Sequence, residues 1–195
     1  MPYSLPLALT SVFSVFVDRN DIKSVLDLGC GFGKYGYLSR EYFDAWHGRY
    51  EEKSWTTRIV GVEIFEKYIT DTQRRVYSDI IIDDALTYLK RSSEKFDVIL
   101  CMDMIEHLTK ERGVELLNEM IGHCNKITFV SAPDGFVAQG SLYGNIHENH
   151  LCGWSRGEFE KVGYKTHLIR VGELKKILAH RGSASFDQMK VEYYD

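Results

Sequence analysis

The chain lacks the features that would place it in a membrane or on a nucleic acid. No apolar stretch in its 195 residues reaches the roughly 20 residues needed to span a bilayer. The apolar run at residues 5–17 lacks the basic n-region and the small-residue cleavage site of a signal peptide. The formal net charge of -4 argues against nucleic acid, which normally needs a basic face. These absences predict a cytoplasmic protein with no membrane partner, and they argue against a nucleic-acid partner.

Paired cysteines are also missing. The four cysteines, Cys30, Cys101, Cys124 and Cys152, lie far apart and form no C-x-x-C pair. That spacing predicts neither a zinc knuckle nor a disulfide framework. Reduced thiols in a cytosolic protein fit the pattern best.

The composition is that of an ordinary globular protein, with 44% hydrophobic and 13% aromatic residues. The length suits one domain with a real core and is too short for two large ones. We therefore expect a single domain over residues 1–195, undivided by any repeat or linker. Within residues 1–23, apolar side chains spaced by three and four predict an amphipathic helix over 5–17. The oligomeric state stays open, with a homodimer among the options.

The stretch VLDLGCGFGKYG, residues 25–36, predicts a strand, a tight turn and the start of a helix. Glycine lets such a turn adopt positive φ and lets a ligand lie against the backbone. Two glycine frames overlap here. Gly31, Gly33 and Gly36 fit the dinucleotide pattern G-x-G-x-x-G, which is weak evidence alone. The other frame begins at an acid and runs Asp27-x-Gly29-x-Gly31-x-Gly33.

The frame that begins at Asp27 resembles the first motif of class I S-adenosylmethionine (SAM) dependent methyltransferases. That resemblance implies that the acid lies near the cationic end of the methionine moiety. A carboxylate at this point would repel a pyrophosphate and attract an ammonium group, so we favour SAM over NAD. The cofactor-binding residues expected in the turn are Asp27, Gly29, Cys30, Gly31 and Gly33.

The next expected strand, 58–63, ends in an acid, and two acids follow the one after it, 79–82. In nucleoside-binding α/β folds, an acid where Glu63 stands accepts hydrogen bonds from the ribose hydroxyls. The resemblance supports this role for Glu63 and implies that Asp84 holds the adenine amino group, with the N–H of Ala85 nearby. One of two adjacent acids at a helix start is an N-cap. Asp83 is therefore either that cap or the adenine ligand in place of Asp84.

The fourth expected strand, 96–103, is apolar almost throughout and should be buried on both faces. The stretch from Asp103 through Glu106 to His107 resembles the D/E-x-x-E-H segment of small-molecule methyltransferases of the ubiquinone-biosynthesis O-methyltransferase type. It does not resemble the N/D-P-P-Y box of enzymes that methylate amino groups of bases or of glutamine. We expect Asp103 to contribute to the cofactor site.

The rest of the chain completes the fold. We expect a helix at 109–123, a strand at 126–133, a glycine-rich substrate lid at 134–154, a helix at 155–162, a strand at 164–171, a helical stretch at 173–179 and a strand at 188–194. Alternating strands and helices predict an α/β fold. Its sheet should be doubly wound, Rossmann-like and seven-stranded, mostly parallel with one late antiparallel strand. In such sheets ligands bind beyond the carboxyl ends of the strands.

Three histidines are candidates for a general base at that edge. His147 and His150 of the lid come first, and His107 follows. A base adds about 10²–10⁴-fold to transfer onto a hydroxyl. The spacing of His147, His150 and Cys152, with Glu148 nearby, matches no named zinc site, so we expect no metal. A divalent ion that orients a diol acceptor stays as an alternative.

The sequence thus predicts a SAM-dependent methyltransferase that acts on a small-molecule acceptor, most directly at oxygen. One alternative is methylation of a macromolecule such as tRNA or protein. Another is a SAM-binding protein without transfer activity. An NAD-dependent oxidoreductase is the third.

Overall fold

A seven-stranded sheet forms the centre of the computed structural model, which describes residues 12–13, 16, 19–171 and 173–182. The strands lie in the order β3-β2-β1-β4-β5-β7-β6. Their bounds are β1 Ser24–Leu28, β2 Arg58–Glu63, β3 Asp79–Ile82, β4 Phe96–Met102, β5 Cys124–Pro133, β6 Lys165–Val171 and β7 Leu174–Gly182.

Strands β1 to β5 run parallel to one another. Strand β7 is antiparallel to both of its neighbours, β5 and β6, so β7 is the one reversed strand. The predicted doubly wound, mostly parallel sheet is confirmed. The winding reverses between β1 and β4, and the carboxyl ends there form the edge at which such sheets bind ligands.

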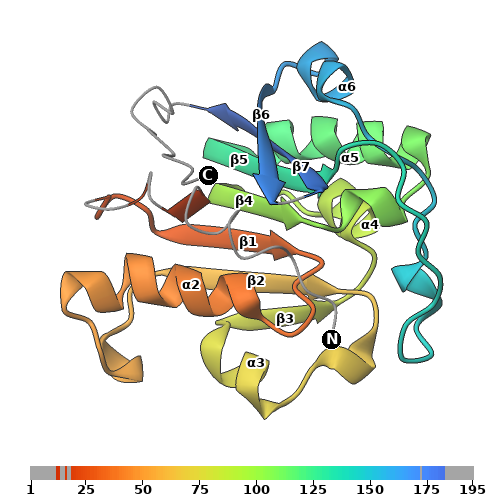
Figure 1. Ribbon diagram of the computed structural model, residues 1–195. Helices are drawn as coiled ribbons and strands as arrows, with labels where there is room; N and C mark the ends of the chain where they lie inside the picture. The colour runs from red at the N-terminus through yellow and green to blue at the C-terminus, as the bar shows by residue number, and fades with distance from the viewer. Residues whose placement is uncertain (1–11, 14–15, 17–18, 172, 183–195) are drawn as a thin grey trace.

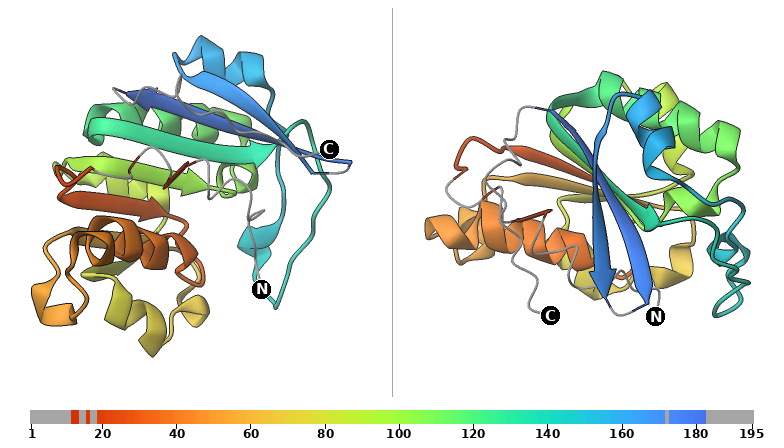
Figure 2. Two further views of the ribbon diagram at one scale, coloured as in Figure 1. Left: turned by 60° about the vertical axis from the view of Figure 1, so that its left-hand side comes forward. Right: turned by 45° about the horizontal axis from the view of Figure 1, so that its top comes forward.

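Helices cover both faces of the sheet (Figures 1 and 2). The α-helices are α2 Lys34–Phe43, α3 Asp71–Val76, α4 Ala85–Arg91, α5 Lys110–His123 and α6 Arg156–Lys161. Short 3₁₀ turns are η1 Ala45–His47, η2 Glu52–Ser54, η3 Glu66–Tyr68, η4 Ile105–His107 and η5 Ile146–Glu148. None of the described helices is long and apolar enough to cross a membrane.

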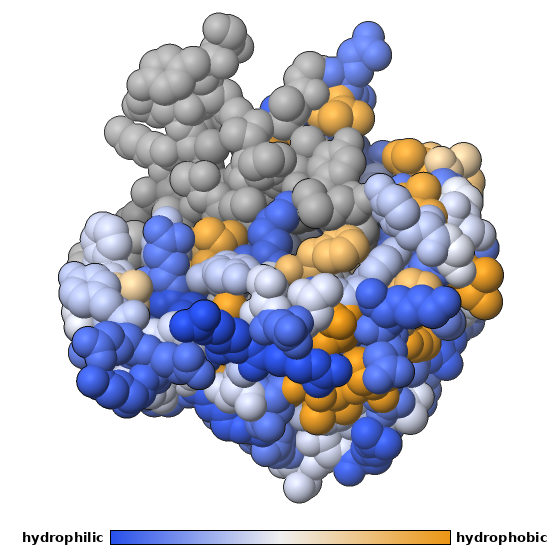
Figure 3. All heavy atoms as spheres, turned by 90° about the horizontal axis from the view of Figure 1, so that it is seen from below, coloured by the Kyte–Doolittle hydropathy of each residue, from blue (hydrophilic) through white to orange (hydrophobic). Residues whose placement is uncertain are grey.

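Side-chain alternation along β1 assigns its residues to two cores. Val25 packs in the cluster under α2 and α3. Leu26 and Leu28 pack in the cluster under α4, α5 and α6. Asp27 shares the parity of Val25 and therefore faces the α2–α3 side. Seen from below the view of Figure 1, the surface combines hydrophilic side chains with a hydrophobic patch (Figure 3).

The predicted helix at 173–179 is wrong, because these residues form most of β7. Ile177, Leu178 and Ala179 are all buried, since β7 lies between β5 and β6 and is covered on both faces. A strand buried on both faces loses the two-residue alternation by which strands are recognised. The predicted strand at 188–194 lies outside the described residues, as does most of the predicted helix at 5–17.

Two glycines in helices illustrate how closely the α2–α3 side is packed. A Cβ added to Gly36 in α2 would lie 2.3 Å from Cζ of Tyr77. A Cβ added to Gly122 in α5 would meet nothing within 4 Å. Alanine substitutions at the two sites therefore compare the cost of close packing with the gain in helix propensity.

We predict that Gly36→Ala destabilises the protein although alanine favours helix. Propensity alone would stabilise by about 0.5–1 kcal/mol, whereas overpacking against Tyr77 costs about 1–3 kcal/mol. Gly122→Ala serves as the control and should stabilise. Urea unfolding of both variants checks this, and a stabilised Gly36→Ala protein would contradict the packing seen here.

Candidate functional site

Backbone hydrogen bonds hold the turn between β1 and α2. Gly29, Gly31 and Gly33 have φ angles of 71°, 50° and 83°, a region that favours glycine. The N–H groups of Gly29 and Cys30 donate to the carbonyl of Val62 at 2.8 and 3.0 Å. The predicted glycine turn therefore forms, anchored to β2.

Further amides of this turn are also occupied. The N–H of Gly31 donates to Oε2 of Glu63 at 2.9 Å, and that of Gly33 donates to the carbonyl of Cys30 at 2.8 Å. A pyrophosphate at a helix start is held by free N–H groups, and these amides already have partners. The turn therefore suits a ligand that lies along its backbone better than a phosphate.

Asp27 lies beneath the turn. It is 1% exposed, and its Oδ2 accepts a hydrogen bond from the hydroxyl of Tyr77 at 2.6 Å. Burial raises the pKa of Asp27 to about 7, although the Tyr77 hydrogen bond favours the ionised form. The structure thus places the acid of the motif against the protein interior.

A pocket opens at the carboxyl edge of the sheet, beside the segment 134–154, which runs along that edge in Figure 1. The predicted site residues that line it are Gly29, Gly31, Glu63, Asp84, Ala85, Asp103, His107 and His147. Four predicted residues are not part of its lining: Asp27, Cys30, Gly33 and His150. The other lining residues are Val62, Ile64, Tyr68, Asp83, Met104, Leu108, Asn145 and Glu148.

Glu63 bridges the end of β2 and the glycine turn. Its second oxygen, Oε1, accepts from the N–H of Phe65 at 2.8 Å. Burial raises the pKa of Glu63, while the backbone hydrogen bonds from Phe65 and Gly31 oppose that rise. Each carboxylate oxygen can accept a further hydrogen bond, so Glu63 retains capacity toward a ligand in the pocket.

Asp84 is the N-cap of α4. Its Oδ1 accepts from the N–H of Thr87 at 2.9 Å, and Arg112 contacts both of its oxygens at 2.7 and 2.8 Å. Burial opposes ionisation, but the hydrogen bonds from Thr87 and Arg112 lower the pKa of Asp84 overall. Asp83 lines the same pocket and pairs with Arg91 at 2.8 Å. Of the two adjacent acids, the cap is therefore Asp84.

Asp103 follows β4 with a φ of 55°, which is uncommon for a residue other than glycine. Its Oδ1 accepts from the hydroxyl of Ser131 at 2.8 Å. Its Oδ2 accepts from the ammonium of Lys176, a residue of β7 that is 5% exposed. The strained backbone is thus held by contacts from β5 and β7.

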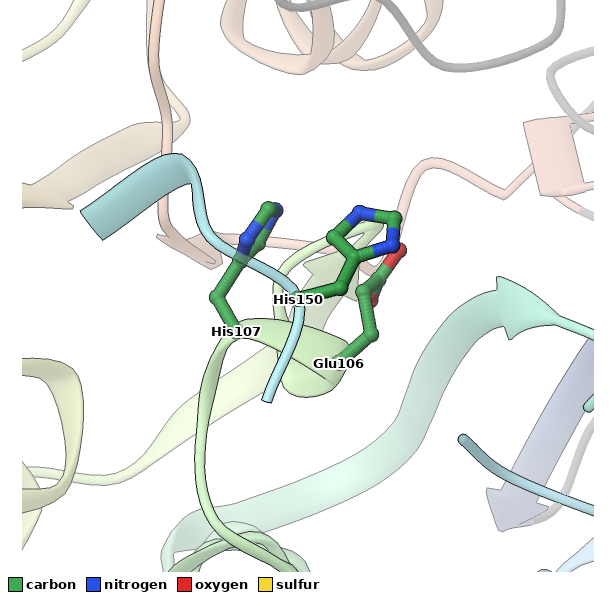
Figure 4. Close-up of side chains that lie close together, drawn as sticks. All are labelled: Glu106, His107 and His150. Carbon is green, nitrogen blue, oxygen red and sulfur yellow. The ribbon is translucent and has the colours of Figure 1, made fainter. Parts of the chain in front are cut away.

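Glu106, His107 and His150 form a cluster in which one possible ligand atom of each lies within 4.8 Å of the others (Figure 4). Glu106 and His107 both project from η4, and His150 reaches them from the segment 134–154. The two imidazole centroids are 4.8 Å apart. The cluster differs from the set weighed from sequence, which joined His150 to His147 and Cys152.

Hydrogen bonds fix the orientation of both imidazoles. Nδ1 of His107 lies 3.2 Å from the carbonyl of Asn149, and Nδ1 of His150 lies 2.6 Å from that of Val137. A carbonyl only accepts, so each Nδ1 carries a proton and each neutral ring keeps its lone pair on Nε2. Burial lowers the pKa of His107, which favours that neutral form.

Glu106 is buried without a hydrogen-bond partner for its Oε2 among the described residues. Burial, reinforced by the charge of Asp103, raises the pKa of Glu106 to about 8. A buried polar atom without a partner commonly marks a functional group or an unseen ligand. Glu106 does not line the pocket, but it lies in one cluster with His107, which does.

The segment 134–154 is tied down over this edge. The hydroxyl of Tyr68 donates to Oε1 of Glu148 at 2.9 Å, and the N–H of Leu151 donates to the backbone carbonyl of Glu106 at 2.9 Å. Gln139 donates to the carbonyl of Glu148 at 2.9 Å. These bonds make η5 part of the pocket wall, and the role of the segment as a substrate lid stays a prediction.

Sequence reasoning missed several contributors to the site. Tyr77, Arg112 and Lys176 contact the predicted acids Asp27, Asp84 and Asp103, and Tyr68 contacts Glu148. No local motif identifies Tyr68 or Arg112. The buried position of Lys176 follows only once β7 is known to be an interior strand.

We predict that Glu106→Gln makes stability less sensitive to pH. The pKa of Glu106 is higher in the folded state than its ordinary value of 4.5, so the native protein binds the proton more tightly. Its contribution to the free energy of unfolding is full below about pH 4 and is lost as pH rises through about 8. Glutamine has no carboxyl group to ionise, so this loss of stability with rising pH disappears. The part of the decline that comes from Asp27 remains.

Urea unfolding at intervals between pH 5 and pH 9 measures this effect. Glu115→Gln, an exposed change on α5, should keep the wild-type dependence on pH. An unchanged dependence in Glu106→Gln would show that the carboxyl group ionises in the folded protein as easily as in the unfolded chain.

Known proteins resemble this chain in sequence. Residues 25–126 match the family model described as "Methyltransferase domain". The mitochondrial ubiquinone biosynthesis O-methyltransferase of Saccharomyces cerevisiae is 26% identical over 112 residues. That alignment covers 55% of this chain and only 30% of the yeast protein.

Solved structures share the fold. A SAM dependent methyltransferase from Archaeoglobus fulgidus superposes with a TM-score of 0.59 at 19% identity, over 90% of this chain and 92% of that one. Magnesium protoporphyrin IX methyltransferase from Synechocystis PCC 6803, with bound SAM, gives 0.57 at 16% identity, over 91% and 79%. At these identities the likeness concerns the fold alone.

The matched family model covers more than half of the 195 residues and includes the glycine turn and the acids that follow β2, β3 and β4. The predicted resemblance to class I methyltransferases is thereby confirmed. This chain belongs to the methyltransferase domain family.

Proposed function

We propose that this protein is a SAM-dependent methyltransferase that methylates a small molecule at oxygen. The observation that carries the proposal is the charge of the pocket. Carboxylates of Glu63, Asp83, Asp84, Asp103 and Glu148 line it, and neither Lys nor Arg is among its lining residues. From outside the lining, Arg91, Arg112 and Lys176 pair with Asp83, Asp84 and Asp103. Glu63 and Glu148 are therefore the acids that offer charge to a cationic ligand. SAM brings a sulfonium and an ammonium group to such a wall, whereas a dinucleotide brings a pyrophosphate. Attraction and repulsion differ by several kcal/mol at these separations.

The pocket at the carboxyl edge of the sheet offers a partner for each part of SAM. Glu63 would accept hydrogen bonds from the ribose hydroxyls, as acids at the end of β2 do in nucleoside-binding folds. The adenine amino group would meet Asp83 or Asp84, with the N–H of Ala85 nearby. The methionine moiety would lie along Gly29 and Gly31, where backbone can approach a ligand closely.

Transfer itself requires little from the protein beyond positioning. The methyl group of SAM leaves from a sulfonium, and alignment of the acceptor contributes about 7–11 kcal/mol to lowering the barrier. A hydroxyl acceptor also gains from a base near neutral pH. His107 lines the pocket, is neutral, and keeps a lone pair on Nε2. We therefore assign the general base to His107, with Glu106 and His150 as its neighbours in the cluster.

The same cluster also supports a second role beside the methyl acceptor, that of a metal site. Two imidazoles and a buried carboxyl group are the residue types that bind divalent transition-metal ions, and each imidazole is oriented through Nδ1 by a carbonyl, as metal ligands usually are. A bound divalent ion would act as a Lewis acid on the acceptor oxygen. Glu106, His107 and His150 would hold it.

The relatives point to a small-molecule acceptor. The yeast relative is named as an O-methyltransferase of ubiquinone biosynthesis, and the Synechocystis neighbour as a methyltransferase of magnesium protoporphyrin IX. The alignment with the yeast protein covers a minor part of its length, so the assignment to oxygen rests on the cluster of Glu106, His107 and His150. Methyl transfer from labelled SAM to a panel of hydroxylated metabolites tests it.

We predict that Glu63→Gln weakens binding of S-adenosylhomocysteine, the product cofactor, roughly ten- to hundredfold, as expected for lost hydrogen bonds to a charged group. Glu66→Gln, an exposed change three residues later, should bind like the wild type. Calorimetric titration at near-neutral pH measures both. Absence of binding by the wild type would overturn the proposed function, and fluorescence titration with NADH would then test the dinucleotide alternative.

We predict that His107→Gln lowers kcat roughly 10²–10⁴-fold, the usual contribution of a general base, with cofactor affinity within threefold of wild type. His147→Gln, a second imidazole on the pocket wall, is the matched variant and should lose less. Chelation separates the two mechanisms. A base requires no metal, whereas a cation site predicts activity lost with EDTA, restored by a divalent transition-metal ion such as Zn²⁺, and abolished equally by His150→Gln.

A further inference from the structure

Tyr77 directly follows α3 and fills the space beneath three glycines. The ring is buried, with 4% of the residue exposed. A Cβ on Gly36 would lie 2.3 Å from Cζ of Tyr77, one on Gly61 3.0 Å from Cδ1, and one on Gly33 3.3 Å from Cε2. These glycines are therefore needed for the fit of Tyr77, and Gly33 is needed for the turn as well.

The hydroxyl of Tyr77 takes the place of a missing helix cap. Gly36 is the third residue of α2, where the N–H has no acceptor within the helix. A capping side chain normally supplies one, but the N-cap of α2 is Gly33, with a φ of 83° and no side chain. The N–H of Gly36 instead donates to the Tyr77 hydroxyl at 3.0 Å.

Asp27 completes this arrangement from the other side. The Tyr77 hydroxyl has one proton, and it donates that proton to Oδ2 of Asp27 at 2.6 Å. Tyr77 is thereby fixed as acceptor toward Gly36. A carboxylate behind the first turn of α2 also complements the positive end of the helix dipole.

Gln73, which lies within α3, holds the turn at its other end. Gln73 of α3 donates through Nε2 to the carbonyl of Gly31 at 3.1 Å. Side-chain hydrogen bonds therefore hold the turn at Gly31 and the first turn of α2 at Gly36. Both contacts come from the segment 73–77, and neither residue lines the pocket.

We propose that Tyr77 is a positioning residue of the cofactor turn, and that Asp27 acts on the cofactor through Tyr77. This inference rests on the proposed function, since it concerns the SAM-binding turn. Asp27, Tyr77 and Gly36 form one chain of hydrogen bonds that ends on the backbone of the turn. Loss of either side chain loosens the turn and weakens cofactor binding, with no lost contact to the cofactor.

The test compares the affinity for S-adenosylhomocysteine in four proteins: wild type, Asp27→Asn, Tyr77→Phe and the double variant. Tyr77→Phe keeps the ring and removes the hydroxyl, and its dissociation constant should rise roughly tenfold. Asp27→Asn still offers an acceptor to Tyr77 and should show a smaller rise. The double variant should match Tyr77→Phe, because Asp27 has no route to the turn once the hydroxyl is gone.

A matched control separates positioning from a general loss of stability. Tyr164 is also buried, at 3% exposed, and its hydroxyl donates to the carbonyl of Leu117 at 3.5 Å. Tyr164→Phe should leave cofactor affinity unchanged. In Tyr77→Phe the KM for SAM should rise with the dissociation constant, while kcat at saturating SAM stays within twofold of wild type.

Distinct outcomes distinguish the failures. No binding by the wild type overturns the proposed function. Binding by the wild type with unchanged affinity in folded Tyr77→Phe overturns the positioning role. Additive effects of the two substitutions would show that Asp27 contacts the cofactor directly. If Tyr77→Phe fails to fold, wild-type affinity in Asp27→Asn overturns the proposal in the same way, and a weakened affinity supports it.

Discussion

The hydrogen-bonded turn between β1 and α2 is the constraint on which the pocket depends. It is anchored to β2 through the carbonyl of Val62 and the carboxylate of Glu63, and to the segment 73–77 through Gln73 and Tyr77. With the amides of Gly29, Cys30, Gly31 and Gly33 occupied, the turn presents a fixed backbone surface. Recognition of polar groups then falls to the side chains at the ends of β2, β3 and β4.

Those side chains are acidic, and a cationic ligand stabilises their negative charge. Burial raises the pKa of Glu63, and the nearby charge of Glu148 adds to it. A positive group placed between these carboxylates relieves both the desolvation and the mutual repulsion. Lys176 relieves Asp103 from within the protein in the same way. The acidic wall and the occupied turn therefore favour the same class of ligand.

Much of this arrangement could be predicted from the sequence, because strands end in acids that a parallel sheet brings to one edge. The position of Asp27 could have been inferred as well, since its parity with Val25 turns it toward α2 and α3. Burial on both faces concealed β7, whose Leu, Lys and Ala content favours a helix. The pairing of His150 with Glu106 and His107 depends on how the segment 134–154 folds back, and no local pattern encodes that.

A crystal structure of the protein with bound S-adenosylhomocysteine tests the central claim most directly. The account predicts the ribose hydroxyls within hydrogen-bond distance of Glu63, the methionine moiety along Gly29 and Gly31, and the contact between Tyr77 and Gly36 unchanged. A ligand bound elsewhere, or a turn that releases its amides to the ligand, would contradict it.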